Sequence, residues 1–160
     1  MNRSERENAA AYWAGSKVLQ VWRGQLLVEQ GQLDIRSSQE FDISQEKFYI
    51  GEQSGIHYFA INQEIAEGSG SSLREIVVNL NEEILEVAVT ALALANWHET
   101  HTHCPRCGNQ TKVISNGWVR ECPDDGTHHF PRTDPAIIVA VQDRNGRLCL
   151  GRQAAWPENR

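Results

Sequence analysis

Apolar and polar side chains alternate along residues 12–66 with the period of two that is typical of β-strands. The alternation predicts strands at residues 18–22, 25–28, 47–50 and 57–61. Glycine adopts backbone conformations that other residues avoid, so the glycines beside these runs indicate turns: Gly24, Gly31, Gly51 and Gly55. The first part of the chain is therefore expected to be built of short strands.

The pattern becomes helical after a short stretch from Gly68 to Ser72, which we interpret as a flexible joint. Asn81 is a candidate N-cap, and two glutamates follow it in the first turn. Apolar residues then recur three and four positions apart, with Leu85, Val89 and Leu92 at the centre of the face. We expect one helix that runs to about Thr100.

Three histidines crowd the expected end of this helix: His98, His101 and His103. A cationic imidazole would be favourable at the negative end of the helix dipole. Imidazole is also a common metal ligand. Helix capping and metal binding are both open hypotheses for these residues.

Two similar short segments follow the helix, Cys104–Gly108 and Cys122–Gly126. Their side chains form the pattern C-x2-C-x14-C-x2-D, and each segment ends in glycine. Two ligands separated by two residues can bind one tetrahedral Zn²⁺ from a tight turn, which the glycine then closes. Paired segments of this kind predict a zinc ribbon whose ligands are Cys104, Cys107, Cys122 and Asp125.

The fourth ligand has alternatives. Zinc accepts carboxylate oxygen, so Asp125 is chemically suitable. His128 or His129 could supply an imidazole nitrogen in its place, with His128 the first alternative. A third hypothesis is that the metal site has decayed and that the two turns persist without zinc.

The end of the chain predicts the start of another sheet. Residues 136–141 are expected to form a buried strand, Asn145-Gly146 a type I′ turn, and residues 148–150 a return strand. Cys149 would then be a small core residue. A last strand in this position would leave an open edge and an uncovered face, so we expect the sequence to be truncated inside a domain.

Composition narrows the class of protein. The chain has 160 residues and a formal net charge of −6, which argues against binding nucleic acid through charge alone. Three of its four cysteines lie in the ribbon pattern, so a disulfide framework is not expected. No run of 18 apolar residues occurs, and the N-terminus lacks an apolar leader segment. We therefore expect a cytoplasmic protein that is not in a membrane.

Several segments together resemble the NADH pyrophosphatases of the Nudix hydrolase superfamily. They are residues 94–98, the Cys-Pro-x-Cys-Gly segment with its x14 spacing, and residues 117–120, 129–138 and 151–157. The likeness is densest over residues 92–157 and weaker over residues 12–90.

The resemblance implies an α+β fold in three parts. Residues 1–100 would form a rudimentary Nudix-like N-terminal domain of strands followed by a helix. Residues 101–131 would form the zinc ribbon, and residues 132–160 the first strands of an incomplete catalytic Nudix domain.

The resemblance also implies an activity. Members of this family hydrolyse NAD(H) to nicotinamide mononucleotide and AMP, remove NAD caps from RNA, use Mg²⁺ or Mn²⁺, and work as homodimers. Phe130 matches an aromatic residue at their nucleotide site, and a core anchor between ribbon and sheet is the alternative role. Trp118 and Trp156 are expected to be structural.

The catalytic Nudix motif is absent from these 160 residues. The motif is G-x5-E-x7-R-E-U-x-E-E-x-G-U, where U is apolar, and its glutamates hold the divalent metal ions. Arg74-Glu75 and Glu82-Glu83 resemble it, but six residues separate the two pairs where the motif has two. Four extra residues would turn the second pair by about 40° and shift it by about 6 Å along a helix.

These glutamates are therefore expected on solvated helix surface, and the chain is expected to be inactive alone. The alternative function is a non-catalytic zinc-ribbon module for binding or dimerisation. A nucleic-acid-binding ribbon is disfavoured by the acidic balance and by the lack of a basic cluster around the ribbon.

Overall fold

The computed structural model describes residues 1–132, 134 and 137–151. A main sheet contains seven strands, which are β1 (Lys17–Trp22), β2 (Gln25–Glu29), β3 (Gln32–Leu33), β4 (Ile35–Ser37), β5 (Lys47–Gln53), β6 (Ile56–Asn62) and β7 (Gly70–Ser72). A small sheet contains β8 (Lys112–Ile114), β9 (Val119–Glu121) and β10 (His128–His129). The helices are α1 (Leu73–Ile76) and α2 (Glu82–Thr100), with short 3₁₀ turns η1 (Ser4–Tyr12), η2 (Ser38–Glu40), η3 (Val77–Asn79) and η4 (Ser115–Gly117). This mixture of strands and helices confirms the expected α+β class.

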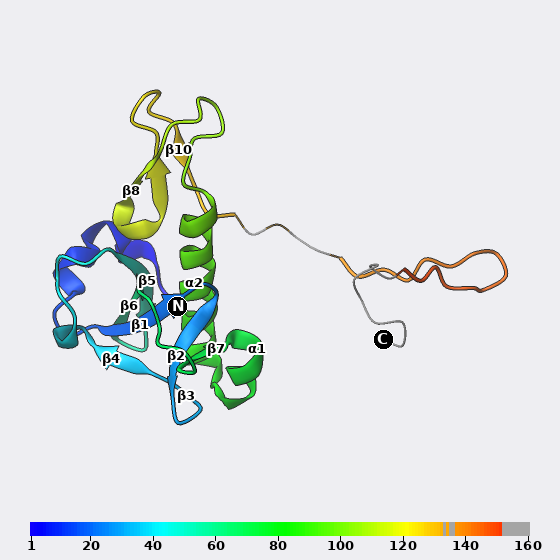
Figure 1. Ribbon diagram of the computed structural model, residues 1–160, viewed down its shortest axis with the longest axis horizontal. Coiled ribbons are helices and arrows are strands. Elements are labelled where there is room, and N and C mark those ends of the chain that lie inside the picture. Colours follow the sequence, from blue (N-terminus) through cyan, green and yellow to red (C-terminus); the bar gives the residue numbers. More distant parts are fainter. Residues whose placement is uncertain (133, 135–136, 152–160) are drawn as a thin grey trace.

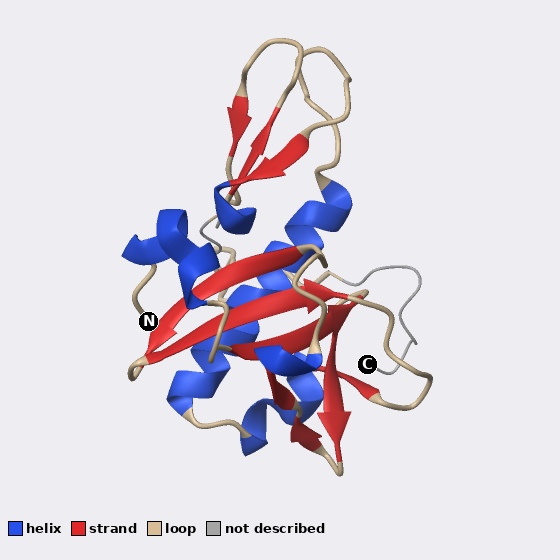
Figure 2. Cartoon of the chain, turned by 90° about the vertical axis from the view of Figure 1, so that its left-hand side faces the viewer, coloured by secondary structure: helices blue, strands red, loops and turns tan. Residues whose placement is uncertain are grey.

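The main sheet is mixed in direction. Its strands lie in the order β3-β2-β1-β6-β5, while β4 also pairs with β1 and β7 with β2. β1 and β6 are parallel, and the other pairs are antiparallel. The long helix α2 crosses behind the sheet and continues beyond it to the small sheet (Figure 2).

The two faces of the main sheet bury two separate cores, as a period of two requires. Leu19, Val21 and Phe48 belong to the larger core, which α2 covers with Val87, Ala88, Ala91, Leu94 and Ala95. Val18, Tyr49 and Phe59 belong to the smaller core, together with Ala9, Trp13 and Ile61. The alternation read from the sequence therefore corresponds to burial on both faces.

All four predicted strands are confirmed, as β1, β2, β5 and β6. Two glycine predictions were wrong. Gly51 lies inside β5, where the pairing register with β6 shifts, and not in a turn. The stretch expected to be a flexible joint contributes β7, which pairs with Leu26 and its neighbours in β2.

The N-cap of α2 is confirmed, because the backbone N–H of Ile84 donates to Oδ1 of Asn81 over 2.9 Å. The centre of its apolar face differs from the prediction, and Val89 is exposed. Apolar residues cover much of the helix circumference, and the face with Ala88, Ala91 and Ala95 packs on the sheet. Small side chains allow the backbone of α2 to approach the sheet closely, which explains why the face rich in alanine is the buried one.

The segment of residues 137–151 extends away from the rest of the molecule (Figure 1). Residues 137–141 form no strand, and their apolar side chains are exposed, so the predicted buried strand was wrong here. A turn is present, because the N–H of Gly146 donates to the Asp143 carbonyl, but the predicted type I′ was wrong, since Asn145 lacks the positive φ that this type requires. The two arms of the turn are joined by a bridge between Gln142 and Leu148 and by backbone hydrogen bonds from Asp143 to Arg147 and from Cys149 to Val141. A strand is stable only when a packing layer as well as another strand adjoins it, and the apolar side chains of this segment are exposed among the described residues.

Cys149 is exposed on the same segment, so its predicted role in a core was also wrong. Trp118 is structural as expected: its indole N–H donates to the carbonyl oxygen of Tyr49 over 2.6 Å, and the Arg3 guanidinium lies over its ring. Trp156 lies outside the described residues.

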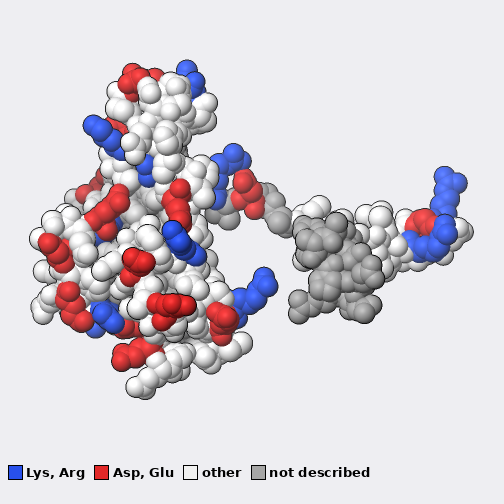
Figure 3. Space-filling model, in the orientation of Figure 1, with Lys and Arg blue, Asp and Glu red and all other residues white. Residues whose placement is uncertain are grey.

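Charged side chains are spread over the surface. On the face drawn in Figure 3, Asp and Glu are scattered over the body with Lys and Arg between them, and no broad basic patch is visible. Among the described residues, no helix combines the length and the apolar character needed to cross a membrane.

Candidate metal centre

The small sheet and its two loops form a ribbon at the C-terminal end of α2 (Figure 1). Its strands lie in the order β10-β9-β8 and are antiparallel. An isolated bridge between His103 and Gln110 closes the first loop. The two Cys-containing segments lie in the two loops, at the end of the ribbon that is remote from the main sheet (Figure 1).

The two loops have the same backbone hydrogen bonds. In the first loop the N–H of Gly108 donates to the carbonyl of Cys104 over 2.9 Å, and in the second the N–H of Gly126 donates to the carbonyl of Cys122 over 3.0 Å. Both glycines have the left-handed φ that such a turn needs, +79° and +67°. Asp125 in the second loop is therefore structurally equivalent to Cys107 in the first.

The donor atoms of the two loops converge. The ligand atoms of Cys104, Cys107, Cys122 and Asp125 all lie within 4.8 Å of one another. The Cys107 and Cys122 sulfurs are 3.5 Å apart, and Cys104 Sγ lies 3.9 Å from Asp125 Oδ2. Two sulfurs bound to one tetrahedral Zn²⁺ at about 2.3 Å would lie about 3.8 Å apart. The spacing is far too long for a disulfide, so these residues fit a zinc ion.

Asp125 is held as a carboxylate. Its Oδ1 accepts a hydrogen bond of 2.9 Å from the backbone N–H of Thr127. Hydrogen bonds from the Thr127 side chain and backbone lower the pKa of Asp125 to about 2. One oxygen is thus fixed by the turn, which leaves Oδ2 facing the sulfurs.

His128 is not part of this cluster. Its Nε2 lies 3.3 Å from Oε1 of Glu121 on the neighbouring strand, at the ribbon surface. The structure therefore places His128, the first alternative ligand, away from the three sulfurs. Asp125 lies close to them. The identity of the zinc ligands themselves stays a prediction.

Phe130 lies at the edge of a groove between the end of α2 and the ribbon. The groove has a volume of about 750 Å³, and Trp97, His101 and Arg132 also line it. The Phe130 side chain is 57% exposed, so its ring is not buried in a core. An exposed aromatic ring in a groove is suited to stacking on a planar ligand.

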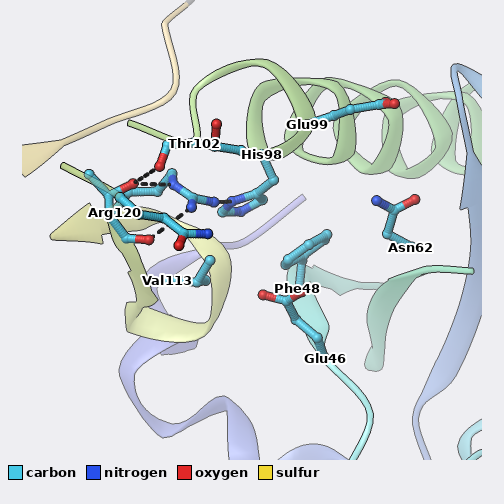
Figure 4. Close-up of a pocket in the computed structure, with 10 residues that line it drawn as sticks. Glu46, Phe48, Asn62, His98, Glu99, Thr102, Val113 and Arg120 are labelled. Carbon is cyan, nitrogen blue, oxygen red and sulfur yellow. Dashed lines mark hydrogen bonds between the residues drawn. The ribbon is translucent and has the colours of Figure 1, made fainter. Parts of the chain in front are cut away.

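A buried network of polar side chains joins the ribbon to α2 (Figure 4). This network was not predicted from the sequence. Arg120 on β9 is only 6% exposed, and its Nε and Nη2 donate to the side chain and the carbonyl of Thr111 over 2.7 and 3.0 Å. Its Nη1 lies 3.0 Å from Nδ1 of His98. In the sequence, Arg120 stood out only because residues 117–120 are among the segments that resemble the NADH pyrophosphatases. That resemblance gave Arg120 no role.

The network determines the tautomer of His98. Nε2 lies 2.8 Å from the carbonyl oxygen of Gly117, which can only accept, so Nε2 carries the proton. Nδ1 then accepts the hydrogen bond from Arg120. Burial and, to a smaller extent, the nearby Arg120 charge lower the pKa of His98, and together they outweigh the opposing effect of the Gly117 carbonyl and bring the pKa to about 4. His98 is thus neutral, and neither a cationic helix cap nor a member of the metal cluster.

Stability is expected to fall as pH decreases from about 6.5 to about 4 because of His98. The unfolded imidazole takes up a proton near pH 6.5 and the folded one near pH 4, so the unfolded state binds more protons in this window. The contribution is fully present above pH 6.5 and is on the order of 3 kcal/mol. Urea unfolding of the wild-type protein should weaken more steeply over this range than that of His98→Gln.

Equal slopes for the two proteins would contradict this prediction. If His98→Gln does not fold, an NMR titration of the wild-type imidazole gives the same answer. A resonance for His98 that titrates near pH 6.5 in the folded protein would then be the contradicting result.

The fold and the clustered donor atoms define an α+β protein that carries a zinc ribbon. Comparison with known proteins agrees, since residues 99–130 match the NADH pyrophosphatase zinc ribbon domain family. The NAD-capped RNA hydrolase NudC of Mycobacterium tuberculosis is 34% identical over 167 residues, which cover 98% of this chain and 53% of that protein. These matches show that the chain is similar to NADH pyrophosphatases, as the resemblance in the sequence indicated.

Two human relatives are similar over shorter lengths. The mitochondrial NAD(P)H pyrophosphatase NUDT13 is 35% identical over 92 residues, or 58% of this chain and 26% of that protein. The NAD-capped RNA hydrolase NUDT12 is 36% identical over 90 residues, or 51% of this chain and 20% of that protein. The chain spans about half the length of the mycobacterial relatives that it matches.

Proposed function

We propose that this chain is the zinc-ribbon part of a Nudix NAD(H) pyrophosphatase, in which Cys104, Cys107, Cys122 and Asp125 bind one structural Zn²⁺. The observation that carries the proposal is the convergence of these four donor atoms inside the segment that matches the family's ribbon. The expected organisation also belongs to the proposal, with parts at residues 1–100, 101–131 and 132–160.

The reaction of the whole enzyme is hydrolysis of the pyrophosphate of NAD(H) to NMN(H) and AMP, with removal of NAD caps from RNA as a related activity. The names of the relatives support this reaction. Bound Mg²⁺ or Mn²⁺ would neutralise the phosphate charge and lower the pKa of the attacking water. The glutamate motif that binds such ions does not occur in these 160 residues.

The contribution of this chain to that reaction would be positional. Zinc makes the ribbon loops rigid, and the network of Arg120 and His98 fixes the ribbon to α2. Phe130 then stands at a defined place in the groove, with its ring exposed for stacking on nicotinamide or adenine.

A non-catalytic module for binding or dimerisation is the second candidate. It is favoured by the exposed apolar side chains of the last described segment, which include Ile137, Ile138 and Val139. A homodimer is proposed from the family alone, and a cytoplasmic location from the composition of the chain.

The purified 160-residue chain is expected to contain one zinc and to release no AMP from NADH. Zinc content is measured by mass spectrometry of the metal, and AMP by chromatography after incubation with Mg²⁺ or Mn²⁺. The activity is expected to be absent because the metal-binding glutamates are absent. Turnover well above the rate without protein would show that another set of residues performs the reaction, and a metal-free protein would overturn the zinc site.

Replacing Asp125 by alanine is expected to weaken zinc binding at least about tenfold, because a water molecule must then fill the fourth position. Asp124→Asn is the matched control, since Asp124 is the adjacent carboxylate outside the cluster and an amide oxygen there can still accept the hydrogen bond from Asn109. Competition with a chromogenic chelator measures both affinities. Asp125→Cys should bind zinc more tightly than the wild type. Equal affinity of Asp125→Ala and the wild type would exclude Asp125 as a ligand.

A further inference from the structure

A second pocket lies where the main sheet, the end of α2 and the ribbon meet (Figure 4). Its volume is about 320 Å³, at the lower end of the range for sites that hold small molecules. The sheet contributes Asn62, α2 contributes His98 and Glu99, and β9 of the ribbon contributes Arg120. None of the four proposed zinc ligands lines this pocket, so a ligand here would be separate from the zinc.

The buried cation of this pocket is Arg120, which is 6% exposed. Its hydrogen-bond partners are the hydroxyl and carbonyl of Thr111 and the neutral imidazole of His98. No carboxylate of the described residues forms an ion pair with it. A buried charge is costly unless an opposite charge accompanies it. The hydrogen bonds use one N–H of each nitrogen, so Nη1 and Nη2 each keep a second N–H for another acceptor.

The negative charges of the pocket belong to Glu46 and Glu99, which are both exposed. Figure 4 shows Glu99 across the pocket from Arg120. The lining therefore carries one positive charge and two negative ones, because His98 is neutral. A simple anion would be repelled by the two carboxylates, and a simple cation by the guanidinium. A molecule that carries both signs avoids each repulsion.

We propose that this pocket binds a small ligand that carries both a carboxylate and an ammonium group, such as a free amino acid. The carboxylate accepts from Nη1 and Nη2 of Arg120, because a guanidinium presents its N–H bonds in a fixed geometry that suits a carboxylate. The ammonium group lies beside Glu46 and Glu99. Binding supplies the buried guanidinium with its counter-charge, and it requires neither zinc nor the hydrolysis of NAD(H).

Calorimetric titration of the full chain with glycine, γ-aminobutyrate and ε-aminocaproate tests the proposal. These probes differ in the distance between their two charges. We expect at least one of them to bind in the millimolar range or more tightly. It should bind at least about tenfold more tightly than the analogue that lacks its amine and the analogue that lacks its carboxylate. Binding by none of the three, or equal binding of either analogue, would overturn the proposal.

Variants of the two exposed carboxylates supply the second test. Glu46→Gln and Glu99→Gln should each weaken binding of the best amino acid about three- to fivefold, as expected for partly solvated ion pairs. Each should strengthen binding of the analogue that lacks the amine, because a repulsive charge is gone. Glu67→Gln is the matched control, since Glu67 is an exposed carboxylate that does not line the pocket. Changes in the same direction for both probes, or no change, would refute the role of the carboxylates.

NMR locates the ligand in the wild-type protein. At saturation with the best amino acid, we expect the Nε–H signal of Arg120 and the side-chain amide signals of Asn62 and Gln110 to shift, while the amides of β3 stay unchanged. Arg120→Lys keeps the charge but loses the planar fork, so it should weaken binding at least about tenfold. If this variant does not fold, the wild-type shifts decide. Shifts that exclude the pocket, or full affinity of a folded Arg120→Lys, would overturn the proposal.

Discussion

Replacing Cys107 by serine is expected to abolish tight zinc binding and to unfold the ribbon loops, while the main sheet and α2 stay folded. A neutral hydroxyl is a poor zinc ligand, and the binding energy of a structural zinc is also folding energy for the segment that surrounds it. Cys107 is exposed, so the substitution removes little packing. The expected effect therefore measures the loss of the zinc ion and not the loss of packing around the side chain.

Hydrogen exchange measures the outcome residue by residue. The amides of Gly108, Cys122 and Gly126 donate to carbonyls within the two loops, and their protection should fall to that of an unfolded chain. Amides in β1 and β6 should change little. Cys149→Ser is the matched control, since this thiol is also exposed but lies on the last described segment. Full protection of the loops in Cys107→Ser would show that the turns persist without metal.

The second large effect is expected for Gly117→Ala, which should lower the free energy of unfolding by about 2–5 kcal/mol. Gly117 has a φ of +99°, and a Cβ at this position would lie 2.9 Å from Cβ and 3.1 Å from Cα of Phe48. Phe48 is 1% exposed in the larger core, so it has no space into which to move. The ribbon and the sheet would have to separate locally.

Gly55→Ala is the matched control, because Gly55 has a φ of +80° with no atom within 4 Å of the added Cβ. It should cost only the backbone penalty, about 1–2 kcal/mol. Urea unfolding followed by circular dichroism gives both values. If the two variants lose equal stability, the close approach of Gly117 to Phe48 does not constrain the junction.

The features predicted well from the sequence depend on local patterns. The alternation in residues 18–22 and the cap at Asn81 are local properties, and the structure realises both. The spacing of the Cys segments likewise predicted which donor atoms would meet. In these cases the residues that decide the structure lie within a few positions of one another or in two repeated turns.

The features that were missed depend on distant partners. Residues 136–141 were expected in a buried strand from their composition, but a strand also requires a packing layer, and the described residues 137–141 are exposed. The contact of His98 with Arg120 joins residues 22 positions apart in the chain. No periodicity signals such a pair, and the apolar spacing of α2 even favoured the wrong centre for its buried face.

The turn at residues 115–118 contacts three parts of the molecule outside the ribbon. Asn116 donates to the carbonyl of Arg6, Gly117 accepts from His98, and the Trp118 indole donates to Tyr49. Ligand binding to one part of a cooperative structure stabilises every part that unfolds with it. Zinc binding would then add to the stability of this turn and of the contacts that it makes. A ribbon excised at residue 101 would lose all three contacts, so a domain boundary drawn along the sequence at that residue separates groups that stabilise one another.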